Sequence, residues 1–131
     1  MSFSSNPELL KRGKKVYEDL YAGTSADQMT EEYHGKSDDF AGMALEWCIG
    51  GLMGRPGLDY KSRELVALTL CAADGRLQGA VLAHAEACLK VGATKKEVYE
   101  AILMITWYAG AAPVSLALST LNDFFGDEEL A

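Results

Sequence analysis

The chain has 131 residues, of which 49% are hydrophobic and 24% are charged, a globular composition that excludes a disordered chain. Twelve lysine and arginine residues face 19 aspartate and glutamate residues, so the formal net charge is −7. Nucleic acid binding needs a clustered basic field, and this acidic balance argues against such a partner. The length predicts a single domain that covers residues 1–131.

The cysteines indicate a cytoplasmic location. Cys48, Cys71 and Cys88 form an odd, widely spaced set without a CxxC pair. Such a set is typical of a reducing compartment and not of a disulfide framework. The N-terminal residues lack a basic region followed by an apolar one, so no signal peptide is expected.

One uncharged stretch, residues 101–122, is long enough to span a bilayer. However, Gly110 and Pro113 interrupt it, and four serine and threonine residues dilute it. Two short buried helices around a Gly/Pro break are therefore favoured over a transmembrane helix, and we expect no membrane partner.

The composition predicts an all-α fold. Alanine (18) and leucine (17) far outnumber isoleucine (3) and valine (6), and no stretch alternates apolar and polar residues over the length of a strand. We predict a bundle of about six helices. In chain order they cover residues 7–20, 38–51, 59–74, 77–91, 95–110 and 113–125, with a polar connector at 22–36 and an acidic tail at 126–131.

Local signals support these boundaries. Asn6 precedes Pro7 as an N-cap before the first helical position, and Ser37 is the expected cap of the second helix, which should end at Gly50-Gly51 or soon after. Gly92 suits the position after a helix C-terminus. Thr94-Lys95-Lys96-Glu97 has the spacing of a capping box.

The chain has two histidines. His34 lies in the polar connector and is interpreted as an exposed loop residue. The helical neighbours of His84 are apolar, so this side chain faces either the core or a pocket. Glu64 also lies along an apolar stripe, and a buried carboxylate needs partners.

Folding the third and fourth predicted helices back on each other places these two residues level. Glu64 lies ten residues before Asp74 and His84 ten after it, so each lies roughly 15 Å from the turn. An antiparallel hairpin would bring together an acid and a base that suit proton transfer. A purely structural Glu–His pair is the alternative.

The same hairpin separates Cys71 from Cys88 by roughly 16 Å along its axis, which is beyond disulfide reach. We expect packing thiols, with Cys88 lining the pocket one turn from His84. Arg63 and Arg76 are candidates to bind a carboxylate, and surface charges are the alternative.

The remaining basic and aromatic residues give no clear signal of a cofactor or ligand site. Further basic residues near the hairpin are Arg55 and Lys61. Trp47, Trp107 and Tyr108 are interpreted as core or interface residues. No P-loop, dinucleotide fingerprint or Cys/His metal pattern is present, so we expect no metal site.

Several segments resemble the carboxymuconolactone decarboxylase family, which includes the alkylhydroperoxidase D-like proteins. The matching segments are Lys-Ser-Arg-Glu-Leu at 61–65, Leu-Ala-His at 82–84, Ala-Cys-Leu-Lys-Val-Gly-Ala-Thr-Lys-Lys-Glu-Val at 87–98 and Tyr-Ala-Gly at 108–110. The resemblance covers about residues 40–124. It implies an alkylhydroperoxidase D-like helical subunit that assembles into a ring, a trimer or a hexamer.

The resemblance also implies an activity. The peroxidase branch carries a CxxC where this chain has Leu77 and Ala80, so the decarboxylase branch is favoured. The expected substrate is a carboxylated unsaturated lactone such as γ-carboxymuconolactone, in protocatechuate breakdown, and no cofactor is needed. His84 would carry the proton, Glu64 would orient it, and Arg63 or Arg76 would bind carboxylate.

Two other functions stay open. One is a thiol-dependent redox enzyme that uses Cys88 with His84 nearby. The other is a non-catalytic helical assembly protein, in which Glu64 and His84 only support the packing.

Overall fold

The computed structural model describes residues 4–21 and 38–131. These residues form helices and no strand, which confirms the all-α prediction. The chain divides into two compact units, residues 1–60 and residues 61–131. The single-domain interpretation stays a prediction. His34, Ser37 and the connector lie outside the described residues.

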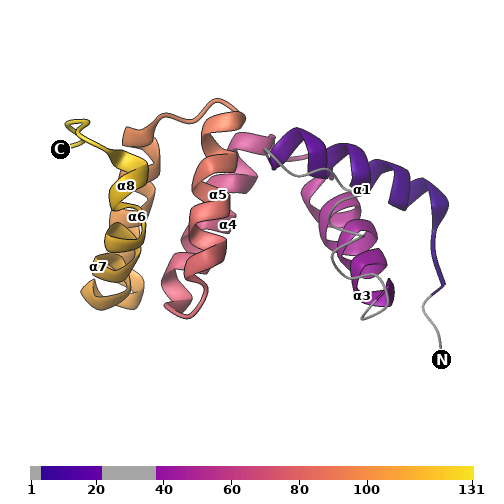
Figure 1. Cartoon of the computed structure of the whole chain (residues 1–131), viewed down its shortest axis with the longest axis horizontal. Coiled ribbons are helices and arrows are strands. Elements are labelled where there is room, and N and C mark those ends of the chain that lie inside the picture. Colours follow the sequence, from indigo (N-terminus) through magenta and orange to yellow (C-terminus); the bar gives the residue numbers. More distant parts are fainter. Residues whose placement is uncertain (1–3, 22–37) are drawn as a thin grey trace. The chain divides into compact units, whose positions relative to one another are not determined.

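The first unit contains α1 (Pro7–Leu20), the short α3 (Asp38–Met43) and the π-helix η1 (Ala44–Met53). Figure 1 labels α1 and α3. The helix α1 begins as predicted. Asn6 Oδ1 accepts the N–H groups of Glu8 and Leu9, both at 3.2 Å, and Pro7 follows at the first helical position.

The two main helices of this unit meet backbone to backbone. A Cβ on Gly13 would lie 1.9 Å from the carbonyl oxygen of Leu45, and one on Gly50 would lie 2.6 Å from that of Leu9. The helix was predicted to end at Gly50-Gly51 or soon after, and it continues as η1 to Met53, two residues beyond this pair. Here Gly50 permits close packing and does not end the helix.

A buried carboxylate fastens the start of α1 to η1. Glu46 is 1% exposed, and its two oxygens accept the backbone N–H of Asn6, each at 3.0 Å. Ser5 Oγ also donates to it. This contact was not predicted from the sequence. The signal that could have indicated it is the position of Glu46 within a largely apolar helix.

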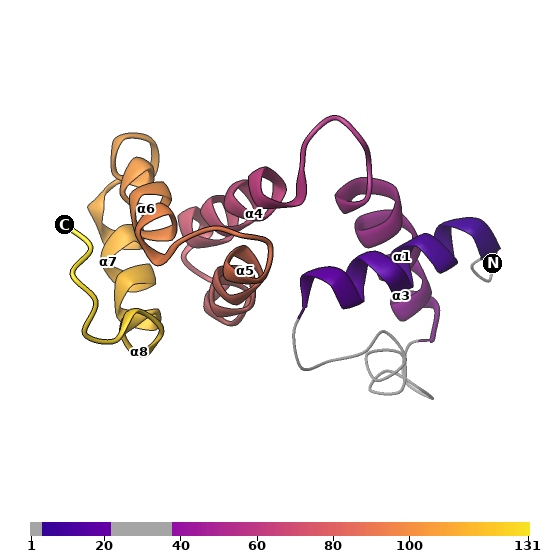
Figure 2. The ribbon, with the colours of Figure 1, turned by 90° about the horizontal axis from the view of Figure 1, so that it is seen from above.

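The second unit contains α4 (Tyr60–Asp74), α5 (Gln78–Lys90), α6 (Lys95–Ala109), α7 (Ala111–Thr120) and α8 (Asn122–Phe125). Figures 1 and 2 show α4 beside α5 and α6 beside α7. One apolar core joins them. Its largest fully buried members are Leu68, Val81, Cys88, Val98, Ile102 and Leu121.

The middle boundaries agree with the prediction to within a residue or two. Gly92 adopts φ +101° two residues after the end of α5, and Thr94 Oγ1 accepts the N–H of Glu97 at 3.0 Å to begin α6. Gly110, at φ +93°, separates α6 from α7 within the uncharged stretch. Among the described residues, no helix is both long and apolar enough to cross a membrane.

The last predicted helix differs from the structure in two respects. It begins at Ala111 and not at Pro113, because the first turn of a helix tolerates a residue without an N–H. It also breaks at Leu121, after which α8 runs to Phe125.

The prominent aromatic residues lie on the surface. Trp107 is 87% exposed, Tyr108 78% and Trp47 56%. These residues were predicted to belong to the core or to an interface, and the first of these two predictions is therefore wrong within this chain.

Candidate functional site

The candidate site is the contact between Glu64 on α4 and His84 on α5. Nδ1 of His84 lies 2.6 Å from Oε2 of Glu64. The Glu64 side chain is fully buried, whereas the His84 side chain is 19% exposed. The structure thus confirms the predicted meeting of these two residues across the hairpin.

The turn between the helices sets this register. The helix α4 ends at Asp74, and Gly75 reverses the chain at φ +76°, a conformation that glycine adopts at little cost. The helix α5 then runs back beside α4 from Gln78 (Figure 2). Glu64 and His84 lie at equal distances from this turn along the two helices, and their side chains therefore meet across the hairpin.

The contact determines how the imidazole can act. An ionised Glu64 favours a proton on Nδ1 of His84 and fixes the orientation of the ring. The other nitrogen, Nε2, lies at the opposite edge of the ring from Nδ1. His84 is partly exposed while Glu64 is fully buried, so of the two side chains only the imidazole is in contact with solvent. This arrangement suits a histidine that transfers a proton through Nε2.

Two thiols lie in the electrostatic field of Glu64. Burial, with a smaller effect of the Glu64 charge, raises the pKa of Cys88 to about 12. Burial, then the charges of Glu64 and Asp74, also raises the pKa of Cys71. Both thiols therefore stay protonated near neutral pH and are poor nucleophiles. The three cysteines, Cys48 included, are free thiols.

The basic candidates occupy different places. Lys61 on α4 pairs with Glu97 on α6, with 2.6 Å between Nζ and Oε2. Arg63 is half-buried in the first turn of α4, next to Glu64 in the sequence. The sequence predicts Glu97 as part of a capping box only. The ion pair with Lys61 was not predicted.

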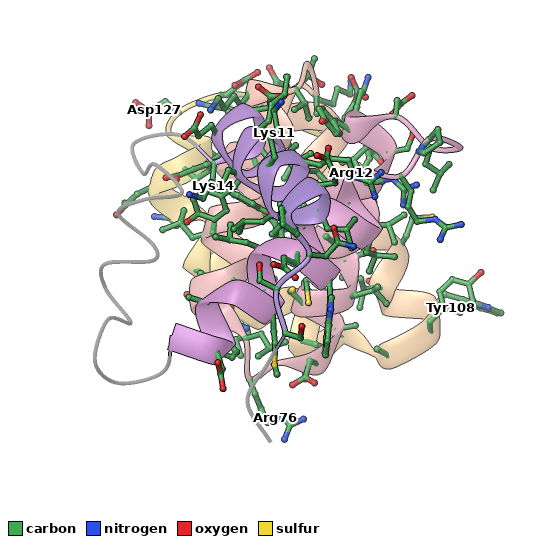
Figure 3. The ribbon with its side chains drawn as sticks, turned by 90° about the vertical axis from the view of Figure 1, so that its right-hand side faces the viewer. Lys11, Arg12, Lys14, Arg76, Tyr108 and Asp127 are labelled. Atoms are coloured by element: carbon green, nitrogen blue, oxygen red, sulfur yellow. The ribbon has the colours of Figure 1, made fainter. Side chains whose placement is uncertain are left out.

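Arg76 lies at the other end of the hairpin. Its guanidinium donates to both carboxylate oxygens of Asp74, with Nε to Oδ1 at 2.8 Å and Nη2 to Oδ2 at 3.1 Å. Figure 3 shows the side chain extending away from the ribbon. The eight residues from Arg76 to His84 correspond to roughly 12 Å along the helix axis. The structure therefore does not bring Arg76 to the Glu64–His84 pair.

The part of the chain that the structure describes contains no group of three His, Cys, Asp or Glu side chains that could hold a metal ion. The fold and site define an all-helical protein in which a buried carboxylate contacts a partly exposed histidine on a helical hairpin.

Comparison with known proteins agrees with this description. The model of the carboxymuconolactone decarboxylase family matches residues 43–123, more than half of the chain. The chain is also similar to the 4-carboxymuconolactone decarboxylase of Acinetobacter baylyi, strain ATCC 33305 / BD413 / ADP1. The two are 28% identical over 121 residues, which cover 92% of this chain and 90% of the relative. This chain belongs to the carboxymuconolactone decarboxylase family.

Proposed function

We propose that this protein is a cofactor-independent decarboxylase of a carboxylated unsaturated lactone such as 4-carboxymuconolactone, also called γ-carboxymuconolactone. The observation that carries the proposal is the contact between His84 and the buried Glu64. Family membership and the relative named 4-carboxymuconolactone decarboxylase support the choice of substrate class.

The proposed reaction balances without an external oxidant or reductant. The bond between the ring carbon and the departing carboxylate breaks, and its carbon leaves as carbon dioxide. The electron pair of that bond stays in the unsaturated lactone, where conjugation with the carbonyl delocalises it. A proton from His84 Nε2 then forms the new C–H bond on the ring, and the imidazole recovers a proton from water.

Each residue has a defined role in this proposal. His84 is the catalytic residue because it is the partly exposed member of the pair. Glu64 is a positioning residue that holds the ring through its contact with Nδ1. Arg63 binds a substrate carboxylate, a task that suits the planar guanidinium. Arg76 is the weaker candidate because it lies at the other end of the hairpin, roughly 12 Å along the helix axis from His84.

Cys88 has a limited role. It is fully buried in the apolar core and its pKa is raised to about 12, so it packs there as a neutral thiol. These properties argue against the alternative of a thiol-dependent peroxidase that uses Cys88 with His84. A non-catalytic assembly protein would not need a partly exposed histidine held by a buried carboxylate.

The wider setting belongs to the same proposal. The substrate would arise in aromatic catabolism by way of protocatechuate, and three free thiols suit a cytoplasmic location. We also expect the subunits to assemble into a trimer or a hexamer.

Carbon dioxide release from enzymatically generated γ-carboxymuconolactone tests the proposal. The wild type should release it, while His84→Ala and Glu64→Gln should retain the fold, by circular dichroism, and lose most of the rate. Glu86→Gln on the exposed face of α5 is the matched control and should react like the wild type. No release by the wild type would overturn the function, and an undiminished rate in His84→Ala would overturn the site.

A further inference from the structure

The first turn of α5 begins without a side-chain cap. Leu77 occupies the N-cap position, and its side chain makes no capping hydrogen bond. The first backbone N–H groups of a helix have no partner within the helix, so a capping side chain normally stabilises its beginning. Thr94 supplies such a cap at the beginning of α6. The beginning of α5 therefore depends on contacts from elsewhere in the second unit.

Gln78, the first residue of α5, makes two such contacts. Its Nε2 donates to the carbonyl oxygen of Gly75 in the turn at 3.3 Å. Its Oε1 accepts the hydroxyl proton of Thr120, the last residue of α7, with 2.5 Å between the two oxygens. Gln78 and Thr120 are both partly buried. One carboxamide thus connects the turn, the beginning of α5 and the end of α7.

The chemistry of the partners fixes the direction of both hydrogen bonds. A backbone carbonyl can only accept, so the NH₂ side of the Gln78 carboxamide faces Gly75 and its oxygen faces Thr120. The Thr120 hydroxyl also lies 3.0 Å from the carbonyl oxygen of Leu116. A hydroxyl has a single proton, and the nearer acceptor, Oε1 of Gln78, takes it. Loss of either polar group therefore breaks the connection between the turn and α7.

The turn that Gln78 holds is the one that sets the register of the two site helices. Glycine has the widest conformational freedom of all residues, so the φ of +76° at Gly75 needs support from neighbouring groups. The bonds between Asp74 and Arg76 support the turn locally, whereas the second bond of Gln78 reaches α7. His84 follows Gln78 by six residues, roughly 9 Å along α5. Because a helix is a stiff element, a displacement of its first turn is passed along α5 to the imidazole.

We propose that Gln78 and Thr120 are positioning residues for the proposed reaction, because they fix the beginning of α5 to α7 and so hold the imidazole of His84 in place against Glu64. This inference rests on the proposed function. Both residues act through the helix α5 and not by contact with the substrate. Misplacement of a catalytic group by about 1 Å can cost about 100-fold in rate. The apolar core still packs α5 when the bond is lost, so we expect kcat to fall about tenfold and KM to stay within about twofold.

Steady-state carbon dioxide release from the lactone measures the effect on the reaction. Gln78→Met and Thr120→Val roughly keep the size of each side chain but remove the bond between them, so each should lower kcat about tenfold. The double variant should be no slower than the slower single variant, because both lose the same contact. Thr120→Ser keeps the hydroxyl and should react within about twofold of the wild type. Ser119→Ala removes an exposed hydroxyl from the same helix and is the matched control.

A spectroscopic measurement without substrate separates positioning from stability. In a His34→Gln background, His84 is the sole histidine of the chain. The proton between its Nδ1 and Glu64 should resonate far downfield in the proton NMR spectrum, as expected for a short, charge-assisted hydrogen bond. At a temperature where all variants are folded, this resonance should move upfield in the two variants that lack the bond. It should stay in place in Thr120→Ser and in the matched control.

Three results would overturn the proposal. The first is a resonance that stays in place in Thr120→Val, and the second is an unchanged kcat in that variant although the resonance has moved. The third is an equal loss of rate in Thr120→Ser, which would show that the hydroxyl is not the group that matters. No carbon dioxide release by the wild type would overturn the proposed function instead, and the resonance would still decide whether these residues position His84.

Discussion

Glu64 and His84 lie 20 residues apart in the sequence, yet the carboxylate of one lies 2.6 Å from the imidazole of the other. The carboxylate is fully buried and the imidazole is partly exposed. This asymmetry gives the two members different expected roles, because solvent reaches the imidazole and not the carboxylate. Substitutions can separate these roles.

The pair should behave as one unit in the proposed reaction. His84→Ala and Glu64→Gln should each lower kcat by about 10²–10⁴-fold, the range for a lost proton-transfer group. The double variant should be about as slow as the slower single variant, since residues that act together are not additive. Steady-state carbon dioxide release measures all three. Independent, multiplying losses would contradict a shared step.

The conservative variant Glu64→Asp distinguishes positioning from packing. It keeps the charge but shortens the side chain by one methylene, so the ring should be held less well. We expect kcat between those of the wild type and Glu64→Gln, with melting temperatures of the two variants close together. A rate that followed the melting temperature alone would instead assign Glu64 a structural role.

Carboxylate binding should depend on Arg63 more than on Arg76. Arg63→Gln should raise KM at least tenfold, because a charge-assisted hydrogen bond to the substrate is lost. Arg76→Gln should raise KM less, because Arg76 lies at the other end of the hairpin, roughly 12 Å along the helix axis from His84. Substrate titrations of the two variants supply the comparison. A larger effect in Arg76→Gln would reverse the assignment.

The thiols should react in the order of their exposure. Cys48 is exposed, whereas Cys88 is fully buried with a pKa raised to about 12. With an aromatic disulfide reagent near pH 8, we expect one fast phase that disappears in Cys48→Ser and persists in Cys88→Ser. A fast phase that depended on Cys88 would restore the redox alternative.

Local sequence signals predicted the parts of the fold that local geometry determines. The hairpin register followed from equal spacing about Asp74, and the start of α6 followed from Thr94 and Glu97. The role of Gly50 could not be predicted in this way. A glycine pair is typical of a helix end, and only the close approach of α1 shows that Gly50 lies inside a helix.

The partners of charged residues likewise could not be predicted from the sequence. The Lys61–Glu97 pair and the hydrogen bonds from the Asn6 backbone N–H to the Glu46 carboxylate join residues that are far apart in the chain. Spacing along one helix gives no information about such contacts. The pairing of Glu64 with His84 was accessible only because both lie on one hairpin.

The close approach of α1 and η1 predicts that the effect of a glycine-to-alanine substitution on stability depends strongly on its position. Gly13→Ala places a Cβ 1.9 Å from the Leu45 carbonyl oxygen, so the helices must separate. We expect a loss of at least about 2 kcal/mol in the free energy of unfolding. Gly79→Ala is the control. Its Cβ meets nothing within 4 Å, and alanine should stabilise α5 by up to about 1 kcal/mol. Urea denaturation measures both, and equal effects would contradict the packing described.

The Lys61–Glu97 ion pair predicts how stability responds to acid. The bond from Lys61 lowers the pKa of Glu97 below the ordinary value of 4.5. A carboxyl group with a lowered folded-state pKa adds stability that is present above the ordinary value. That stability is lost as the pH falls through the lowered one.

Glu97→Gln removes this titration while keeping a side chain that can complete the capping box. The melting temperature of the variant should lie below that of the wild type near pH 6, and the difference should shrink towards pH 3. Glu100→Gln, an exposed carboxylate on the same helix and outside this ion pair, is the control. A constant difference between wild type and Glu97→Gln over this range would contradict the contribution of the ion pair.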